Sequence, residues 1–146
     1  MVELYKRTYT SRALEITIAL LLFALGGGIY VAFRSTSLRM FDWFNYIGLH
    51  DIVLVVRSIA NGIHLPSTIL YCIPDGLWTL SYIILMDAIW SPDVKKQLLF
   101  GGIIPFFGVT LEIFQYFNLS RGTFDVVDLS LYIVPYVVYL ILKIKL

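Results

Sequence analysis

A long apolar run near the N-terminus limits the fold more than any other feature of the sequence. Residues 13–33 contain one charged side chain, Glu15, close to the start of the run. As an α-helix this run reaches about 30 Å, the thickness of the hydrocarbon core of a bilayer. We therefore predict a membrane-spanning helix. Lys6, Arg7 and Arg12 precede it as in a signal peptide, but the run is too long for one and no cleavage motif follows, so we expect it to remain attached.

The composition agrees with a membrane protein and excludes a water-soluble globule. Of the 146 residues, 59% are hydrophobic and 14% are charged, whereas soluble domains have about a quarter of their residues charged. The 11 basic and 10 acidic side chains nearly balance, so nothing indicates nucleic-acid binding. The one cysteine, Cys72, cannot form an internal disulfide, and we expect it to be a small buried hydrophobic side chain.

Further apolar runs predict four membrane spans in total, at residues 13–33, 66–90, 97–117 and 126–143. The second run is interrupted by Pro74-Asp75-Gly76. Its helix begins either near Pro66 with a kink or at Asp75, which would then be the N-cap. Ser91 and Pro92 are expected to start the next helix in the same way, as a hydroxyl cap and a first-turn proline.

The segment between the first two spans has a different character. Residues 37–61 mix charged and aromatic side chains and contain no run of eighteen apolar residues. We predict an interfacial amphipathic helix followed by a re-entrant helix, with a fifth full span as the alternative. The predicted fold class is an all-α membrane protein. It is a four-helix transmembrane bundle with an interfacial or re-entrant helical segment, in one domain over residues 1–146.

The basic residues predict the orientation of this bundle. Basic residues resist translocation, so they gather on the cytoplasmic side of a membrane protein. With both termini in the cytoplasm, all five lysines fall on that side, whereas a five-span model would move Lys143 and Lys145 outside. The predicted cytoplasmic residues are Lys6, Arg7, Arg12, Lys95, Lys96, Lys143 and Lys145, and the predicted external ones are Arg34, Arg39, Arg57 and Arg121.

Polar residues gather at the outer ends of the last two spans. Glu112 and Gln115 share one face of the third span, and Asp125 and Asp128 share one face of the fourth. Because the turn between these helices is short, we expect the polar side chains to converge. The second span starts on the same side. The candidate ligand-binding residues are Glu112, Gln115, Arg121, Asp125, Asp128, Asp75 and Trp78.

When several acids lie close to only one or two arginines, keeping all of the acids ionised costs free energy. We expect a raised pKa, a bound cation, or a further basic partner such as Arg57 or His64. The alternative is a purely structural hairpin, in which Asp125 caps the fourth helix and Arg121 pairs with Glu112. The sequence has no His or Cys pattern with metal spacing and no Ser-His-acid set, so we predict no catalytic residues, metal or cofactor.

The same polar residues form a motif that resembles a known family. Glu112-x-x-Gln115 followed by Arg121-Gly122-x-Phe124-Asp125-x-x-Asp128 resembles the closing motif of the VanZ-like bacterial membrane proteins. Pro74-Asp75-Gly76-Leu77-Trp78 is similar to an earlier element of related small membrane families. The resemblance implies a helical protein of the bacterial plasma membrane, in a family whose named members are associated with resistance to lipoglycopeptide antibiotics of the teicoplanin type.

These observations favour a non-enzymatic protein that binds a polar headgroup. The expected partners are membrane lipids or a lipid-linked envelope molecule, and a lipid-tailed antibiotic would offer a similar headgroup. The alternative is a small structural or assembly subunit, with a membrane-protein partner or a second copy of itself packed on Gly101, Gly102 and Gly108. A third, enzymatic hypothesis uses Glu112 and Asp128 as acid and base.

Overall fold

The computed structural model describes the backbone of residues 2–144 and the side chains of residues 11–143. This part of the chain is helical and contains no strand, so the predicted all-α class is confirmed. The eight helices are α1 (Val2–Phe33), α2 (Arg39–Tyr46), α3 (His50–Ile59), α4 (Ser67–Tyr71), α5 (Ile73–Trp90), α6 (Val94–Gly101), α7 (Ile103–Tyr116) and α8 (Val126–Ile144).

Three helical stretches are long and apolar enough to cross a membrane. They are Ser11–Phe33, Val94–Tyr116, which joins α6 and α7, and Val126–Lys143. They correspond to the first, third and fourth predicted spans. The second predicted span is divided between α4 and α5 and includes two acids, Asp75 and Asp87, which lower its mean hydropathy. The structure thus supports three of the four spans by length and composition.

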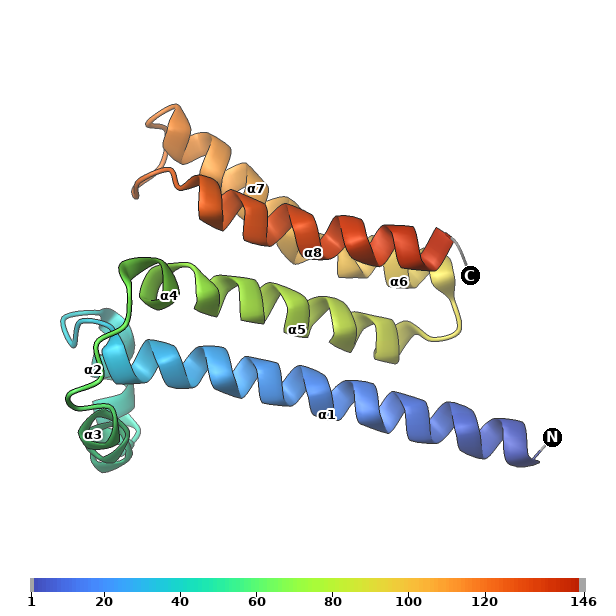
Figure 1. Ribbon diagram of the computed structural model, residues 1–146, viewed down its shortest axis with the longest axis horizontal. Helices are drawn as coiled ribbons and strands as arrows, with labels where there is room; N and C mark the ends of the chain where they lie inside the picture. Colours follow the sequence, from blue (N-terminus) through green and yellow to red (C-terminus); the bar gives the residue numbers. More distant parts are fainter. Residues whose placement is uncertain (1, 145–146) are drawn as a thin grey trace.

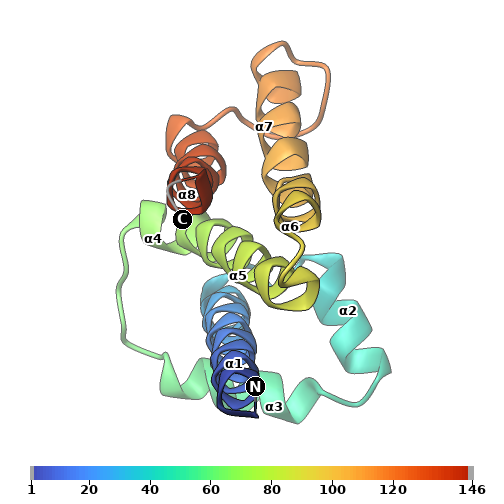
Figure 2. The same cartoon turned by 90° about the vertical axis from the view of Figure 1, so that its right-hand side faces the viewer.

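Helix α5 lies at the centre of the molecule (Figure 1). It packs along α1 on one side and against α8 on the other, while α6 contacts α5 and α7 contacts α8. Seen along the helices, α1 and α7 lie on opposite sides of α5 (Figure 2). The long helices therefore fan out around α5, and the C-terminal end of α7 diverges from α1 (Figure 1).

Small residues allow α1 and α5 to approach closely. A Cβ atom on Gly26 would lie 2.8 Å from Nε1 of Trp78, so only glycine fits there without a shift. Two hydrogen bonds cross the same contact, from Trp78 Nε1 to the carbonyl of Phe23 (3.2 Å) and from Ser81 Oγ to the carbonyl of Ala19 (2.7 Å). Gly26 therefore marks a close contact between α1 and α5. Such small-residue contacts are typical of helices packed within membranes.

Glycines and tyrosines make the contact between the last two long helices. A Cβ atom on Gly108 would clash with Cδ1 of Tyr132, and one on Gly102 would lie 2.6 Å from the hydroxyl oxygen of Tyr136. Gly101 faces Tyr139 more loosely. These glycines, which the sequence offered as contacts for a partner, are therefore used within the chain.

The helix starts differ from two of the sequence-based expectations. The second predicted span begins with α4 directly after Pro66 and is interrupted at Cys72, in agreement with the kinked alternative. Asp75 is not an N-cap, because it lies inside the first turn of α5 and caps no backbone N–H. The cap of α6 is Asp93 and not Ser91, since Asp93 accepts a hydrogen bond from the backbone N–H of Lys96 (3.1 Å). This bond and the nearby Lys96 ammonium hold the pKa of Asp93 below its usual value.

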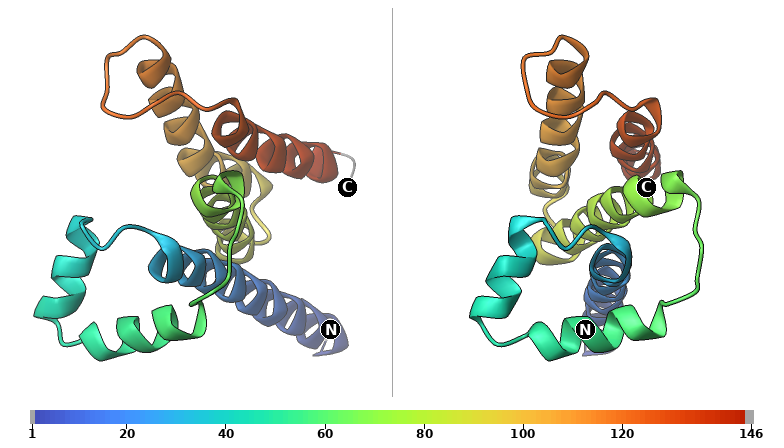
Figure 3. Two further views of the ribbon diagram at one scale, coloured as in Figure 1. Left: turned by 60° about the vertical axis from the view of Figure 1, so that its left-hand side comes forward. Right: turned by 90° about the vertical axis from the view of Figure 1, so that its left-hand side faces the viewer.

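Helices α2 and α3 lie across one end of the long helices (Figure 3). At ten residues α3 is about 15 Å long, which is too short to cross a bilayer and excludes the fifth full span. Both helices expose large apolar side chains, as an interfacial segment requires: Trp43, Tyr46, Ile52 and Ile59. Arg57 joins this segment to α1, because its Nη1 donates to the carbonyls of Val31 (3.0 Å) and Arg34 (2.9 Å).

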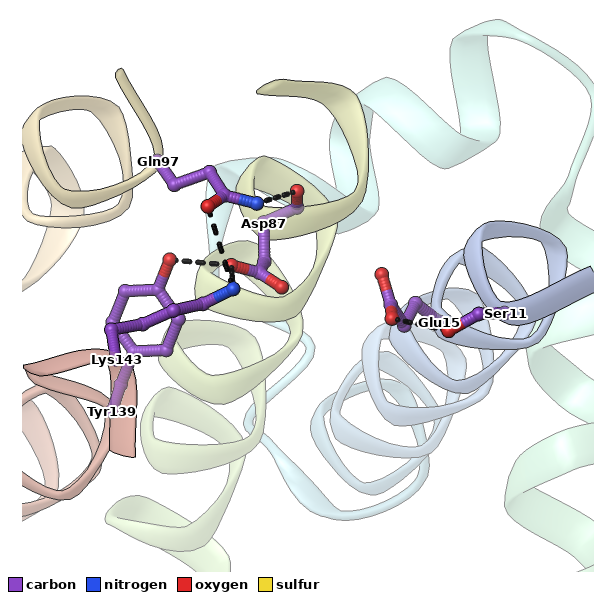
Figure 4. Close-up of polar contacts among 6 residues, drawn as sticks. All are labelled: Ser11, Glu15, Asp87, Gln97, Tyr139 and Lys143. Carbon is purple, nitrogen blue, oxygen red and sulfur yellow. Dashed lines mark hydrogen bonds and ion pairs between the residues drawn. The ribbon is translucent and has the colours of Figure 1, made fainter. Parts of the chain in front are cut away.

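A polar cluster joins three helices at the opposite end of the molecule (Figure 4). The Lys143 ammonium lies 2.7 Å from Oδ1 of Asp87, and the Tyr139 hydroxyl donates to the same oxygen (2.6 Å). Gln97 donates to the Asp87 carbonyl (2.8 Å) and accepts a longer bond from Lys143 (3.4 Å). We call these four residues the α5–α8 polar cluster. Lys95 and Lys96 lie near the same end, while the Lys6 and Arg7 side chains and all of Lys145 lie outside the described residues.

Candidate ligand-binding cavity

A cavity of about 570 Å³ opens where four of the long segments meet. Its lining residues come mainly from the C-terminal ends of α1 and α7 and the N-terminal ends of α5 and α8. These helix ends lie at the end of the molecule that bears α2 and α3 (Figure 1). The lining residues are Arg34, Tyr71, Asp75, Leu111, Glu112, Gln115, Thr123, Asp125, Asp128 and Tyr132. Five of the seven candidate residues from the sequence are among them: Asp75, Glu112, Gln115, Asp125 and Asp128.

Glu112 is the most enclosed acid of the cavity. It is 5% exposed and lies about one turn inside the end of α7. Its Oε2 accepts a hydrogen bond from the backbone N–H of Asp125 (3.0 Å), which fixes the start of α8 against the end of α7. No side-chain cation among the described residues forms an ion pair with it. The pairing of Glu112 with Arg121, which was part of the structural alternative, is therefore wrong.

Asp125 caps the first turn of α8, as predicted. Its Oδ1 accepts a hydrogen bond from the backbone N–H of Val127 (2.7 Å), and a carboxylate at a helix N-terminus also interacts favourably with the helix dipole. The other oxygen, Oδ2, lies 3.8 Å from Sγ of Cys72. Asp125 thus has a structural role that accounts for one of its oxygens and leaves the other beside the cavity.

Asp128 differs from Asp125 because one of its carboxylate oxygens lacks a hydrogen-bond partner. Its Oδ1 is buried and has no hydrogen-bond partner among the described residues. Burying a polar oxygen without a partner costs about 1–3 kcal/mol, so such an atom requires an explanation. Asp75 and Glu112 line the same cavity, and like charges so close together add to this penalty.

The cation of the cavity is Arg34, which the sequence analysis did not select. Its guanidinium carbon lies 4.9 Å from the ring centre of Tyr30 and 4.5 Å from that of Tyr71, so the group lies against two aromatic faces. Stacking of this kind orients a guanidinium without neutralising it. Arg34 forms no ion pair with the described carboxylates, and its Nε is buried without a partner. Four acids therefore share the cavity with one unpaired arginine.

Four residues suggested by the sequence lie away from the cavity. Arg121 is exposed in the turn after α7 and does not line it. Trp78 faces α1, where its indole contacts Gly26. The two basic partners that we considered for the acids are also elsewhere, because Arg57 caps α1 and His64 is exposed in the loop before α4.

The turn between α7 and α8 is organised by Gln115 and Gly122. Gly122 has φ +123°, a conformation that L side chains rarely adopt, and a Cβ atom there would lie 2.7 Å from Nε2 of Gln115. The glycine thus leaves room for the Gln115 amide at the cavity wall.

The sequence did contain an indication of Arg34, because it is the first charged residue after the first predicted span. Its stacking on Tyr30 and Tyr71, however, is visible only in the folded structure.

The arrangement is suited to binding a polar molecule that brings positive charge or several hydrogen-bond donors. Carboxylates accept such bonds, whereas the Arg34 guanidinium and the Gln115 amide can donate to the same molecule. A volume of 570 Å³ lies within the range of about 300–1,000 Å³ typical of small-molecule sites. The cavity wall also includes an exposed apolar side chain, Leu111.

Comparison with known proteins gives no further constraint on the site. No protein-family model, no curated protein and no solved structure matches the chain. The resemblance of its last third to the VanZ-like closing motif therefore stays a prediction.

Proposed function

We propose that the protein is a multi-pass protein of the bacterial plasma membrane that binds the polar headgroup of a lipid-linked envelope molecule in the acidic cavity, without converting it chemically. The observation that carries the proposal is the convergence of Asp75, Glu112 and Asp128, from three different helices, on one cavity at the end of the apolar helices. Burying an acidic side chain in a membrane protein costs free energy. Acids that are buried without a basic partner therefore indicate a functional site.

The membrane topology of this proposal has four spans, with α5 as the second. Its 18 residues reach about 27 Å, and its two acids lie near its two ends. Asp75 lies at the cavity, and Lys143 neutralises Asp87 at the opposite end. Between these acids, residues 76–86 have no charged side chain. Helix α5 is also shielded from lipid, because it packs between α1 and α8.

The lysines support a cytoplasmic location for both termini. The described side chains of Lys95, Lys96 and Lys143 lie at the end of the molecule opposite to the cavity. The cavity end has arginines instead, of which Arg34 and Arg57 are engaged by aromatic rings or carbonyls. By the positive-inside rule the lysine end is cytoplasmic, so the cavity faces the outer leaflet.

The VanZ-like resemblance fits this proposal in part. Within its closing motif, Glu112, Gln115, Asp125 and Asp128 line the cavity, whereas Arg121 does not. We therefore propose that the shared acids mark a common binding site. A role in resistance to teicoplanin-type lipoglycopeptides is an extension of this proposal, since such antibiotics combine a polar body with a lipid tail.

Lipid co-purification tests the proposed function. We expect native mass spectrometry of the wild-type protein, extracted in mild detergent, to retain a lipid-linked species that the double variant Glu112→Gln, Asp128→Asn loses. The variants keep the shape of each side chain and remove only its charge. Arg121→Gln is the matched control, because Arg121 lies in the turn between α7 and α8, which carry Glu112 and Asp128, but does not line the cavity. Equal retention of the species by the wild type and the folded double variant would refute the proposal.

The other two hypotheses have less support. The assembly hypothesis relied on Gly101, Gly102 and Gly108, which contact tyrosines of α8 in the same chain. The enzymatic hypothesis requires an acid and a base next to a reacting group. The Glu112 Oε2 that would serve it is engaged by the Asp125 N–H. We therefore retain binding as the proposed function.

A further inference from the structure

A second group of donor atoms lies beside the cavity, and Cys72 is at its centre. The thiol lies at the junction of α4 and α5 and is 2% exposed. One donor atom each from Cys72, Asp125 and Asp128 lies within 4.8 Å of the other two. Cys72 is more than fifty residues from the two acids in sequence, so only the packing of α5 against α8 brings them together.

We propose that Cys72, Asp125 and Asp128 form a zinc site. A thiolate with two carboxylates is a donor set that Zn²⁺ accepts, whereas Mg²⁺ and Ca²⁺ prefer oxygen ligands alone. In a tetrahedral site with metal–ligand distances of about 2.0–2.3 Å, sulfur and oxygen ligands lie about 3.5 Å apart. Sγ of Cys72 and Oδ2 of Asp125 are already 3.8 Å apart. Movements of the donor atoms by about 1 Å would therefore bring all three to the separations of a tetrahedral site.

The hydrogen bonding of Asp128 also supports a cation at these residues. Oδ1 of Asp128 is buried and has no hydrogen-bond partner among the described residues. A buried carboxylate oxygen of this kind is stabilised when it ligates a metal ion. Glu112, 5% exposed and without a basic partner in the described part of the chain, adds a further negative charge next to Asp125.

The zinc site would share two of its three residues with the wall of the headgroup cavity. Cys72 does not line the cavity, whereas Asp125 and Asp128 lie in its wall. A metal ion there would connect the start of α5 to the start of α8 and reduce the negative charge that faces the cavity. Water would supply the fourth ligand of a tetrahedral ion. This inference goes beyond the proposed function and does not depend on it.

Metal binding to the purified full-length protein tests the proposal. The protein is stripped with a chelator, then dialysed against Zn²⁺ or Co²⁺, and the bound metal is measured by elemental analysis. We expect one metal per chain, and with Co²⁺ we expect the near-ultraviolet absorption of a thiolate-to-cobalt charge transfer. Because the chain has one cysteine, this absorption can come from Cys72 alone.

Three variants make the test specific to these residues. Cys72→Ser is expected to abolish the absorption. Asp128→Asn is expected to weaken metal binding by at least about tenfold, because even residues that only orient a metal ligand cost about that much when they are replaced. Asp93→Asn, at an exposed acid near the opposite end, should change neither. A wild-type protein that binds no metal, or binds it without the thiolate absorption, would overturn the zinc site. The lipid experiment reads a different signal, so failure of one proposal is distinguishable from failure of the other.

Discussion

The ion pair between Asp87 and Lys143 provides a quantitative test of how the helices are held together. The two side chains are 18% and 20% exposed, and the Asp87 carboxylate also accepts the Tyr139 hydroxyl (Figure 4). At the observed separation of 2.7 Å and an effective dielectric constant of about 20, the attraction is about 6 kcal/mol. Desolvation of both groups offsets most of this, so we expect a net coupling of about 1–3 kcal/mol, above that of exposed pairs.

A double-mutant cycle measures this coupling. Lys143→Met removes the ammonium and retains most of the apolar stem, and Asp87→Asn removes the charge of the acid. We expect each single variant to lower the free energy of unfolding by about 2–3 kcal/mol, because the remaining group stays largely buried without its partner. The double variant should lose less than the sum of the two.

The assay is reversible unfolding of the protein in mixed detergent, followed by circular dichroism as the denaturing detergent is increased. The exposed pair of Lys96 and Asp93 serves as the matched control, for which we expect a smaller coupling. A coupling below about 0.5 kcal/mol for Asp87 and Lys143 would refute the reasoning, because it would show that α5 and α8 are joined without help from this pair.

Further predictions concern the other helix contacts, each measured by the same unfolding assay unless stated. Gly108→Ala should lower the free energy of unfolding by about 1–3 kcal/mol, because the new methyl group meets the near edge of the Tyr132 ring, and Gly27→Ala, which meets no atom within 4 Å, should not. An equal effect of both would contradict the packing argument. Trp78→Phe should cost about 0.5–1.5 kcal/mol through loss of its hydrogen bond to a carbonyl of α1, and an unchanged stability would count against that bond. Arg57→Ala should speed hydrogen exchange in the last turn of α1 by freeing two carbonyls, whereas an exchange rate equal to that of wild type would show that Arg57 does not stabilise this helix end.

The parts of the cavity that could be predicted depend on local spacing. Glu112 and Gln115 share a helix face because they are three residues apart, and a short turn then brings Asp125 and Asp128 opposite to them. Those relations survive in the structure, where the four residues line one cavity. The capping role of Asp125 was predictable for the same reason, since a cap needs only its own helix.

The parts that were missed depend on contacts between distant segments. Arg121 is close to Glu112 in sequence, but it extends into the solvent, and the cation of the cavity is Arg34 from the end of α1. Only the position of α1 against α5 determines that contact. The interhelical roles of Asp87 and Trp78 arise in the same way, because each faces a helix that the sequence alone does not place.

The sequence by itself determined that the chain is helical, that it is apolar enough for a membrane, and that acids collect at one end of its last hairpin. Those properties follow from hydropathy and from residue spacing within one helix, which neighbouring helices do not change. The tertiary structure decided which charges meet, because the central position of α5 brings Arg34, Asp75 and Asp128 to the same cavity. It also brought Cys72 to the acids of α8. Contacts between helices depend on how small residues such as Gly26 and Gly108 let the helices approach, and a linear pattern does not contain that geometry.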